Sequence, residues 1–338
     1  MTGGGALRLG TRGSSLARGQ SELVAGALRK AGHPVKLVVV ATAGDLRPPD
    51  TAWGEGAFVG ALEAALLARE VDLAVHSAKD VPLEASLEGR LTIAAYTSRQ
   101  DPRDALVTRD GRGVRPSVPA GGPDHLADVP DAPDAPDGPA VPPVGVSAGG
   151  LQALPGGARV GTDSPRRAAF LRAARPDLQI VPLHGNVDTR LRRLDAGEVD
   201  ALVLAVAGLV RLGHADRAGS PLDPWLLPPA PGQGALAVQC RAEDEALIAT
   251  LTALDHAPTR RCVEAEREVL GGTGGGCRAP LGALATEHAG RVELLAAVVL
   301  PGTGPLVVRG SAPADRSTDL ARALAGALRG AGFRGELA

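Results

Sequence analysis

The stretch VDLAVHSAKDVP, residues 71–82, decides the fold class. Val71 to Val75 is a short apolar run, typical of a buried strand, and it ends in the polar turn His76 to Asp80. The preceding residues, 59–70, carry apolar side chains at helical spacing. Helix, strand and polar turn in this order indicate an α/β sheet, in which ligands bind beyond the carboxyl ends of the strands.

The same alternation of helices and strands extends from this stretch in both directions. Towards the N-terminus it predicts strands over 7–9 and 35–40 and a helix over 16–31, and towards the C-terminus a strand over 91–96. The β-branched run 35–40 is typical of a buried strand, and we expect a mostly parallel sheet with helices on both faces. A second α/β unit follows, with the same element order but no sequence repeat: strands over 104–108, 159–162, 178–181 and 201–205, and helices over 164–174 and 186–196.

The last hundred residues have a different pattern and predict a smaller α+β domain. Its expected elements are helices over 243–254, 259–270 and 318–329 and strands over 281–285, 291–299 and 305–310. We therefore expect three domains: 1–102 with 220–239, 103–219, and 240–338. Residues 116–143 contain nine prolines, five aspartates and no Lys or Arg. Such a composition cannot pack a core, so we expect a disordered or extended insertion that can be deleted without loss of activity.

Composition narrows the function classes. The chain has 36 Lys+Arg against 38 Asp+Glu and only 2% aromatic residues, which argues against a nucleic-acid partner. It shows neither a secretory signal nor an apolar run long enough to span a membrane. Three cysteines are too few for a disulfide scaffold, and the seven histidines have no metal-ligand spacing. These features predict a cytoplasmic protein that binds no metal.

Charged and hydroxyl side chains recur in the predicted strand-to-helix turns. The pair Lys79–Asp80 could bind an anion and stabilise a cation, or Asp80 could simply cap the turn. Arg166 and Arg167 follow Ser164, a predicted helix N-cap, and so lie in a first helical turn, where the helix dipole disfavours positive charge. Two interpretations are open: the arginines bind an anion, or they are merely exposed. The turns 10–15 and 183–190 likewise carry an arginine together with a hydroxyl or amide side chain between a predicted strand and a predicted helix. Together the three turns favour a cleft for carboxylates or phosphates.

A glycine-rich loop, 271–276, leads to Cys277. The loop is neither a Walker A motif nor a dinucleotide fingerprint. A thiol beside such a loop is accessible to covalent attachment, whereas Cys240 and Cys262 stand in apolar contexts typical of small buried residues.

Taken together, eight segments resemble the porphobilinogen deaminase (hydroxymethylbilane synthase) family, in the family's order across nearly the whole chain. They are RLGTRGSSLA (8–17), FVGALEAALL (58–67), VDLAVHSAKDVP (71–82), DPRDAL (101–106), VGTDSPRRAA (160–169), the long segment 185–213, LPPAPGQGALAVQCR (227–241) and GGGCRAPLGA (274–283). The resemblance implies two α/β domains like those of bacterial solute-binding proteins plus a C-terminal α+β domain. It also implies a cytoplasmic monomer that condenses four porphobilinogen molecules head-to-tail into hydroxymethylbilane, with release of ammonia, for tetrapyrrole (haem) biosynthesis.

The resemblance also assigns residues. It implies a dipyrromethane cofactor bound as a thioether to Cys277, and Asp80 as the catalytic carboxylate. Further cofactor-binding residues would be Lys79, Asp80, Thr162, Ser164, Arg166, Arg167 and Arg190. Substrate-binding residues would be Arg12, Ser14, Gln20, Phe58, His184, Asn186 and Arg190. We expect the arginines to line one cleft between the first two domains, with Lys79 and Asp80 at its floor. The chemistry agrees, because a growing chain of pyrrole carboxylates needs fixed cations and a developing cation needs one carboxylate.

Several positions depart from the family's pattern. His184 stands where an arginine is expected, and Asp163 replaces a small residue beside the arginine pair. Ala43, Glu55 and Gly60 also differ, the last two in a loop where lysines are frequent. These departures leave open an alternative, a non-catalytic or degenerate relative that binds pyrroles or other anions without turnover.

Overall fold

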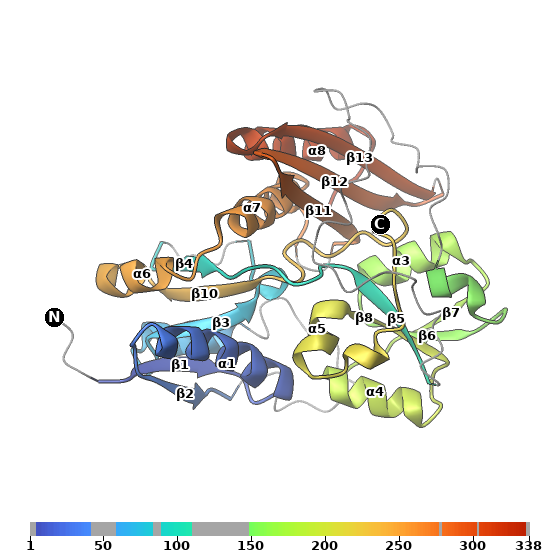
Figure 1. Cartoon of the computed structure of the whole chain (residues 1–338). Helices are drawn as coiled ribbons and strands as arrows, with labels where there is room; N and C mark the ends of the chain where they lie inside the picture. Colours follow the sequence, from blue (N-terminus) through green and yellow to red (C-terminus); the bar gives the residue numbers. More distant parts are fainter. Residues whose placement is uncertain are drawn as a thin grey trace. The chain divides into compact units, whose positions relative to one another are not determined.

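The computed structural model describes residues 5–41, 59–83, 89–109, 149–276, 279–302 and 304–335. The chain separates into two compact units, Met1–Arg99 with Ala235–Arg260 and Gln100–Gly234 with Arg261–Ala338, and Figure 1 shows their elements in chain order. No helix of the described residues is long and apolar enough to cross a membrane. The expected insertion 116–143 and the expected site residues Phe58 and Cys277 lie outside the described residues.

Unit 1 is built on one five-stranded sheet with the order β2-β1-β3-β10-β4. Its elements are β1 (Leu7–Thr11), α1 (Ser15–Lys30), β2 (Val35–Val39), α2 (Gly60–Leu67), β3 (Leu73–Ser77), the 3₁₀ turn η1 (Ala78–Asp80), β4 (Leu91–Tyr96), β10 (Leu236–Arg241), α6 (Glu245–Thr252) and the start of α7 (Ala257–Gly272). The fully buried β10 enters the sheet antiparallel to β3 and β4. The expectation of a mostly parallel sheet is therefore wrong, because half of the pairings are antiparallel, and β10 was not predicted as a strand.

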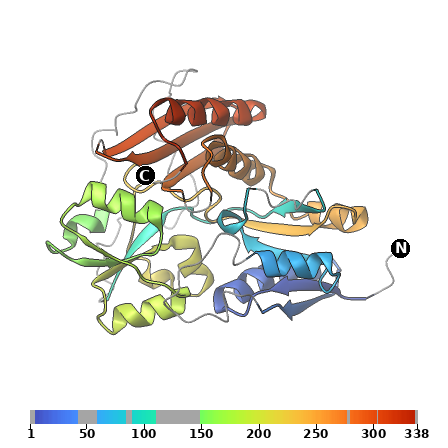
Figure 2. The same ribbon diagram turned by 180° about the vertical axis from the view of Figure 1, so that it is seen from behind.

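Alternate side chains of β3 pack on the two faces of this sheet. Leu73 and Val75 belong to a core cluster with Val24 and Leu28 of α1, whereas Ala74 packs against α2. Figure 1 shows α1 over one face, and Figure 2 shows α2 over the other. The expected arrangement of helices on both faces is confirmed.

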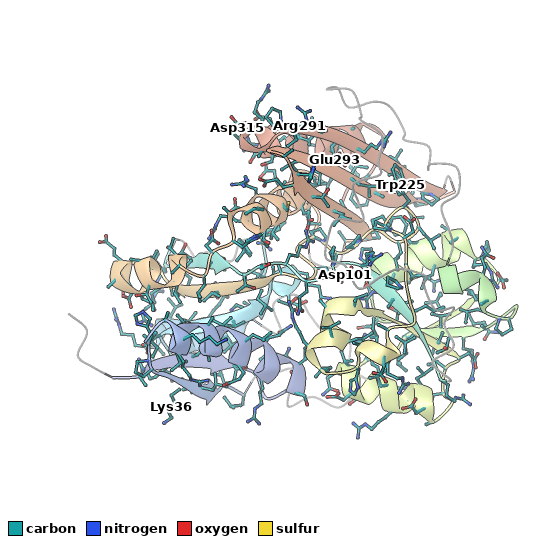
Figure 3. All side chains as sticks on the ribbon, in the orientation of Figure 1. Lys36, Asp101, Trp225, Arg291, Glu293 and Asp315 are labelled. Atoms are coloured by element: carbon teal, nitrogen blue, oxygen red, sulfur yellow. The ribbon has the colours of Figure 1, made fainter. Side chains whose placement is uncertain are left out.

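The strand β2 is an edge strand, which corrects the expectation that it is buried. It pairs only with β1 among the described strands, and its residue Val39 is 55% exposed. Lys36 points from it into solvent (Figure 3). A charged side chain on an edge strand disfavours pairing with further strands, which explains why a β-branched run can lie at the rim.

Unit 2 contains a second five-stranded sheet, β7-β6-β8-β5-β9, and a three-stranded sheet, β11-β12-β13. The first is formed by β5 (Asp104–Thr108), β6 (Arg159–Gly161), α3 (Pro165–Ala174), β7 (Gln179–Val181), α4 (Val187–Asp195), β8 (Ala201–Ala205), α5 (Val206–Arg211) and β9 (Ser220–Pro221), with 3₁₀ turns η3 (Gly149–Ala153) and η4 (Ala215–Arg217). The second is formed by β11 (Leu281–His288), β12 (Arg291–Leu300) and β13 (Gly304–Pro313), followed by η5 (Ala314–Arg316) and α8 (Ser317–Gly330).

The two sheets of unit 2 share one hydrophobic core. Ala297 and Val307 of the three-stranded sheet join the cluster of Phe170 and Val203, with Trp225 packed against it. The opposite face of the three-stranded sheet is covered by α8, whose Leu320 would touch any Cβ added at Gly310. Because β9 pairs with β5, residues 220–234 belong to unit 2 rather than to the first domain as expected. The division into three domains stays a prediction.

The two five-stranded sheets share one contact, between the amino ends of two neighbouring parallel strands. In unit 1, Arg8 donates from its backbone N–H (2.8 Å) and its guanidinium (3.2 and 2.7 Å) to Asp72, just before β3. In unit 2, Arg159 does the same towards Asp200, just before β8, with distances of 2.8, 3.2 and 2.8 Å. The halves thus share a structural repeat, although no sequence repeat was evident.

Candidate functional site

The polar turns of unit 1 lie at one edge of its sheet. Arg12 follows β1, and Lys79 and Asp80 form the end of η1 directly after β3. Since β1 and β3 are neighbouring parallel strands, with Leu9 opposite Leu73, their carboxyl ends share that edge. The structure therefore brings Arg12 to the same sheet edge as the Lys79–Asp80 pair.

Asp80 is half-buried in a single turn of 3₁₀ helix. None of the described residues donates a hydrogen bond to its carboxylate, and the turn's Val81 N–H bonds to the Ala78 carbonyl instead. The hydrogen bonds of this turn therefore give Asp80 no capping role.

A buried chain of polar side chains lies behind this turn. His76 Nε2 lies 3.0 Å from Gln239 Oε1, and Gln239 Nε2 donates to Glu63 Oε1 at 2.9 Å. Because the Gln239 amide N–H already points at Glu63, its oxygen accepts and His76 Nε2 carries the proton. Burial, together with the nearby Arg12 charge, lowers the pKa of His76 to about 4, against a partial offset from the Gln239 bond. His76 is thus a neutral imidazole of fixed tautomer beneath the turn.

Three expected site residues cap helices with their side chains. Ser14 accepts from Ala17 N–H (3.3 Å) at the start of α1, and Ser164 accepts from Arg167 N–H (3.3 Å) at the start of α3. Asn186 accepts from Thr189 N–H at 2.9 Å to begin α4. The predicted N-cap at Ser164 is confirmed. These helices begin at the carboxyl ends of β1, β6 and β7, so the remaining N–H groups of their first turns face that edge.

The remaining expected residues of these helices and turns are buried. Gln20 of α1 is buried in unit 1, and Thr162 is buried in unit 2, where its hydroxyl accepts from Ser164 N–H at 3.2 Å. The Thr162 hydroxyl thereby helps to fix the turn that carries Ser164.

Arg166 and Arg167 converge on a buried carboxylate of the same chain. Asp104 is 0% exposed, and its oxygens accept from Arg166 and from Arg167 at 2.7 Å each. Gln233 adds a third hydrogen bond to Asp104 at 2.9 Å, and Arg166 also donates to the Pro228 carbonyl. We call Asp104, Arg166, Arg167 and Gln233 the arginine–aspartate network. Since both arginines are buried, the alternative that they are merely exposed is wrong.

The network carries two cations and one anion. Burial lowers the pKa of Arg166, and the Arg167 charge adds to this, while Asp104 acts in the opposite sense. Arg167 donates to Asp104 and to the Val203 carbonyl, yet its Nε atom is buried without a hydrogen-bond partner among the described residues. A buried cluster with excess positive charge and an unused donor favours a further anion.

Arg190, His184 and Asp163 form a second group beside it. Arg190 donates through Nε to the Gly185 carbonyl at 2.8 Å. Burial lowers the pKa of Arg190 to about 10; repulsion from Arg167 contributes, and attraction to Asp163 opposes it. His184 Nδ1 lies 2.9 Å from Asp163 Oδ2. The two departures from the family's pattern in these turns are therefore in direct contact.

Sequence reasoning missed two residues of this site, Asp104 and Gln233. Both stand within segments that carried the resemblance, DPRDAL and GQGAL. Nothing in either segment shows that Asp104 meets arginines more than sixty positions away or that Gln233 reaches back to Asp104. The expected burial of Cys240 and Cys262 is confirmed. Within the described ranges, no three His, Cys, Asp or Glu side chains could hold a metal ion together.

The residues present fit a polycarboxylate group such as dipyrromethane. The donors of unit 2 are guanidinium groups, an imidazole and helix N-termini, all of which bind carboxylates well. The excess charge of the arginine–aspartate network and the buried Arg167 Nε are observations in favour of that fit.

The fold and these side chains define a class, a multidomain α/β protein with buried cations at the strand ends of unit 2. The chain belongs to the porphobilinogen deaminase family. Residues 7–122 and 135–249 match the model "Porphobilinogen deaminase, dipyromethane cofactor binding domain", and residues 260–325 match the family's C-terminal domain.

Named relatives agree with the family assignment. A porphobilinogen deaminase of Acidothermus cellulolyticus is 45% identical over 96% of this chain and 89% of its own length. One from Mycobacterium leprae is 46% identical over 82% of this chain and 76% of its own. Among solved structures, a periplasmic substrate-binding protein from Coxiella burnetii matches 78% of this chain and 95% of its own at 16% identity and a TM-score of 0.39.

Proposed function

We propose that this chain is a hydroxymethylbilane synthase that condenses four porphobilinogen molecules, with Asp80 as its catalytic carboxylate. The proposal rests on two features, each at the strand ends of its own unit: in unit 1 the Asp80 carboxylate, which accepts no hydrogen bond from the described residues, and in unit 2 a buried cation cluster. Membership of the family supports the reaction. The alternative of a non-catalytic relative is not favoured, because the matched relatives bear the enzyme's name.

The bound dipyrromethane, attached through Cys277, supplies the primer on which the pyrrole chain grows. Lys79, Thr162, Ser164, Arg166, Arg167 and Arg190 hold its carboxylates. Arg12, Ser14, Gln20, Phe58, His184, Asn186 and Arg190 receive porphobilinogen. In these sets the guanidinium groups bind acetate and propionate side chains, and the capping residues Ser14, Ser164 and Asn186 orient the helix N-termini that share the work.

Asp80 stabilises charge and moves a proton. When porphobilinogen loses ammonia, its C–N bond breaks and the pyrrole becomes cationic. A carboxylate held against that cation lowers the barrier, and it can accept the proton that the attacked pyrrole carbon releases after the new C–C bond forms. The buried chain of His76, Gln239 and Glu63 supports the turn, and burial lowers the pKa of His76 to about 4, so that the imidazole is neutral at neutral pH.

The decisive experiment combines intact mass with turnover. The purified chain is expected to exceed its sequence mass by one dipyrromethane, and Cys277→Ala to lack both that excess and activity, whereas Cys262→Ala keeps both. Asp80→Asn should retain the cofactor but lose turnover by a factor of about 100 or more. Asp195→Asn, an exposed aspartate paired with Arg217, is the matched control and should turn over normally. Near-normal turnover of Asp80→Asn would remove Asp80 from the mechanism.

We further propose that the chain acts in the cytoplasm as a monomer. Light scattering of the cofactor-loaded chain measures the second point directly, and a mass near twice the 34.1 kDa of one chain would contradict it.

A further inference from the structure

We propose that Glu266 is a positioning residue for the cofactor. Together with residues 228–233, which we call the strap, it fixes the two elements on either side of Cys277, α7 and β11, against the arginine–aspartate network. This inference rests on the proposed function and deepens it. A dipyrromethane tethered to Cys277 can bring its carboxylates to the arginines of that network only if the attachment point and the arginines keep a fixed separation.

Glu266 is a buried carboxylate in α7 that joins this helix to two other segments. It is 0% exposed, and its Oε1 and Oε2 atoms accept from the N–H groups of Ala285 and Gly232, at 2.7 Å each. The first contact connects α7 to β11, and the second connects α7 to the strap. Cys277 lies between Glu266 and Ala285 in the sequence. One carboxylate therefore connects both flanks of the attachment point.

The strap lies directly on β11. The Ala283 N–H donates to the Pro229 carbonyl at 2.9 Å. A Cβ added to Gly282 would lie 2.5 Å from the Pro228 carbonyl oxygen, so the two backbones touch with no room for a side chain between them. Positions 228, 229 and 231 are all proline, and the fixed φ of proline removes much of the backbone's freedom. The strap is thus a stiff element held against β11.

The same strap is bound at both of its ends by the arginine–aspartate network. Arg166 donates to the Pro228 carbonyl. Gln233, which is 1% exposed, donates through Nε2 to Asp104 at 2.9 Å and to the Pro102 carbonyl at 2.7 Å. A continuous path of hydrogen bonds therefore leads from α7 and β11 through the strap to an arginine that is proposed to hold the cofactor.

Stability alone does not call for a carboxylate at this position. Burying a carboxylate costs free energy that an apolar side chain in the same place would not cost. What the carboxylate adds is direction, because hydrogen bonds to Gly232 and Ala285 fix the strap and β11 along α7, whereas apolar packing has no preferred direction. A fixed geometry is what a tethered reacting group requires.

Loosening the strap should lower the rate of the reaction more than the affinity for substrate. The cofactor presents the ring to which the first porphobilinogen is joined, and incoming porphobilinogen is proposed to bind to other side chains. A shift of about 1 Å between reacting groups can lower a rate about 100-fold. We therefore expect variants of Glu266 to lower kcat while KM changes little.

The first measurement follows attachment of the cofactor and does not depend on the activity of the loaded enzyme. Chains purified without the cofactor are incubated with porphobilinogen, and intact mass gives the rate at which they gain one dipyrromethane. Glu266→Gln places an amide N–H against a backbone N–H and so loses one of the two contacts; attachment should be about tenfold slower than in wild type. Glu268→Gln, an exposed residue of the same helix paired with Arg322, is the matched control and should load at the wild-type rate.

The second measurement separates positioning from a loss of stability. Loaded Glu266→Gln should show a kcat lowered about tenfold, with KM within about twofold of wild type. Leu320→Ala provides the comparison, because this buried residue of α8 packs on Gly310 of β13, the strand that β12 separates from β11. Assayed below its thermal midpoint, Leu320→Ala should keep the wild-type loading rate and kcat, although it destabilises unit 2.

Gln233→Leu tests the other end of the path and carries the test if Glu266→Gln does not fold. It should slow attachment as Glu266→Gln does. Because both variants would break one path, the double variant should load no more slowly than the slower single variant.

Two results would overturn the inference: attachment at the wild-type rate in both Glu266→Gln and Gln233→Leu, or an equal slowing in Leu320→Ala. Either result can be obtained while the wild type turns over porphobilinogen, so the proposed function would survive. A wild-type chain that gains dipyrromethane but then consumes no porphobilinogen would instead defeat the proposed function.

Discussion

Replacing Asp104 by asparagine tests the charge balance of the arginine–aspartate network. Asparagine keeps the shape and one acceptor oxygen, but the network changes from two cations and one anion to two cations alone. Asp104 is 0% exposed and its two partners only 3% and 6%, so water cannot take over the role of counter-ion. Leaving a buried charge without its partner costs about 3–5 kcal/mol, and we expect unit 2 to lose that much of its free energy of unfolding.

The comparison with Arg166→Met makes the prediction sharper. That substitution removes a cation and leaves one buried pair, so it should cost less than Asp104→Asn even though it deletes a larger side chain. If the network were held by packing alone, the order would be reversed.

The assay is urea unfolding followed by tryptophan fluorescence. The chain has two tryptophans, Trp53 and Trp225, and the second packs against the core of unit 2. In a Trp53→Phe background the signal therefore reports on unit 2. Asp195→Asn, which opens only an exposed pair, should leave the midpoint unchanged. A loss below about 1 kcal/mol for Asp104→Asn, or a larger loss for Arg166→Met, would refute the counter-ion argument.

Three further predictions concern other parts of the chain. The pKa of His76 falls from 6.5 to about 4 on folding, so between these pH values the unfolded chain binds a proton that the folded chain does not. The free energy of unfolding should therefore drop by up to about 3 kcal/mol as pH falls from 6.5 to 4. Hydrogen exchange of the β3 amides measures this loss, which should be smaller in His76→Gln. Gly234 has φ +91°, and an added Cβ would lie 2.4 Å from the Gln100 carbonyl oxygen. Gly234→Ala should therefore lower the midpoint of thermal unfolding. Gly326→Ala is the control and should not lower it, because a Cβ added there meets no atom within 4 Å. Cys240 is fully buried, and burial raises its pKa to about 11; a thiol-alkylating reagent at pH 8 should therefore spare it in the folded chain, and rapid labelling would contradict this.

Local patterns predicted most of the elements, because periodicity and caps act over a few residues. The helix after Ser164 starts at its predicted cap, the helices predicted over 16–31 and 186–196 begin within one residue of their predicted starts, and β8 has its predicted bounds. What failed was long-range. β10 lies about 160 residues from its partner β3 in sequence, and no local pattern shows that it crosses back into the first sheet or runs antiparallel there.

For the candidate site, too, local features could be predicted and long-range contacts could not. Residue types in turns indicated an anion site, and Arg12, Lys79 and Asp80 do share one sheet edge. The sequence could not show that Asp104 already neutralises part of the arginine pair, nor that Asp163 and His184 touch. Both facts depend on side chains brought together by strand pairing, which composition and spacing do not encode.

The twin contacts Arg8–Asp72 and Arg159–Asp200 have a consequence for how this scaffold can change. Each joins the amino end of one strand to that of the middle strand of its sheet, β1 to β3 and β6 to β8. The turns that carry Arg12, Asp80, Asp163 and His184 leave from the carboxyl ends. Anchoring and recognition thus occupy opposite rims of the same sheet. Substitutions at the ligand rim leave the anchors intact, so this rim can accept exchanges such as a histidine–aspartate pair without loosening the strands beneath. A library of variants confined to those turns would test new anion specificities, while each of the two five-stranded sheets keeps its own Arg–Asp contact.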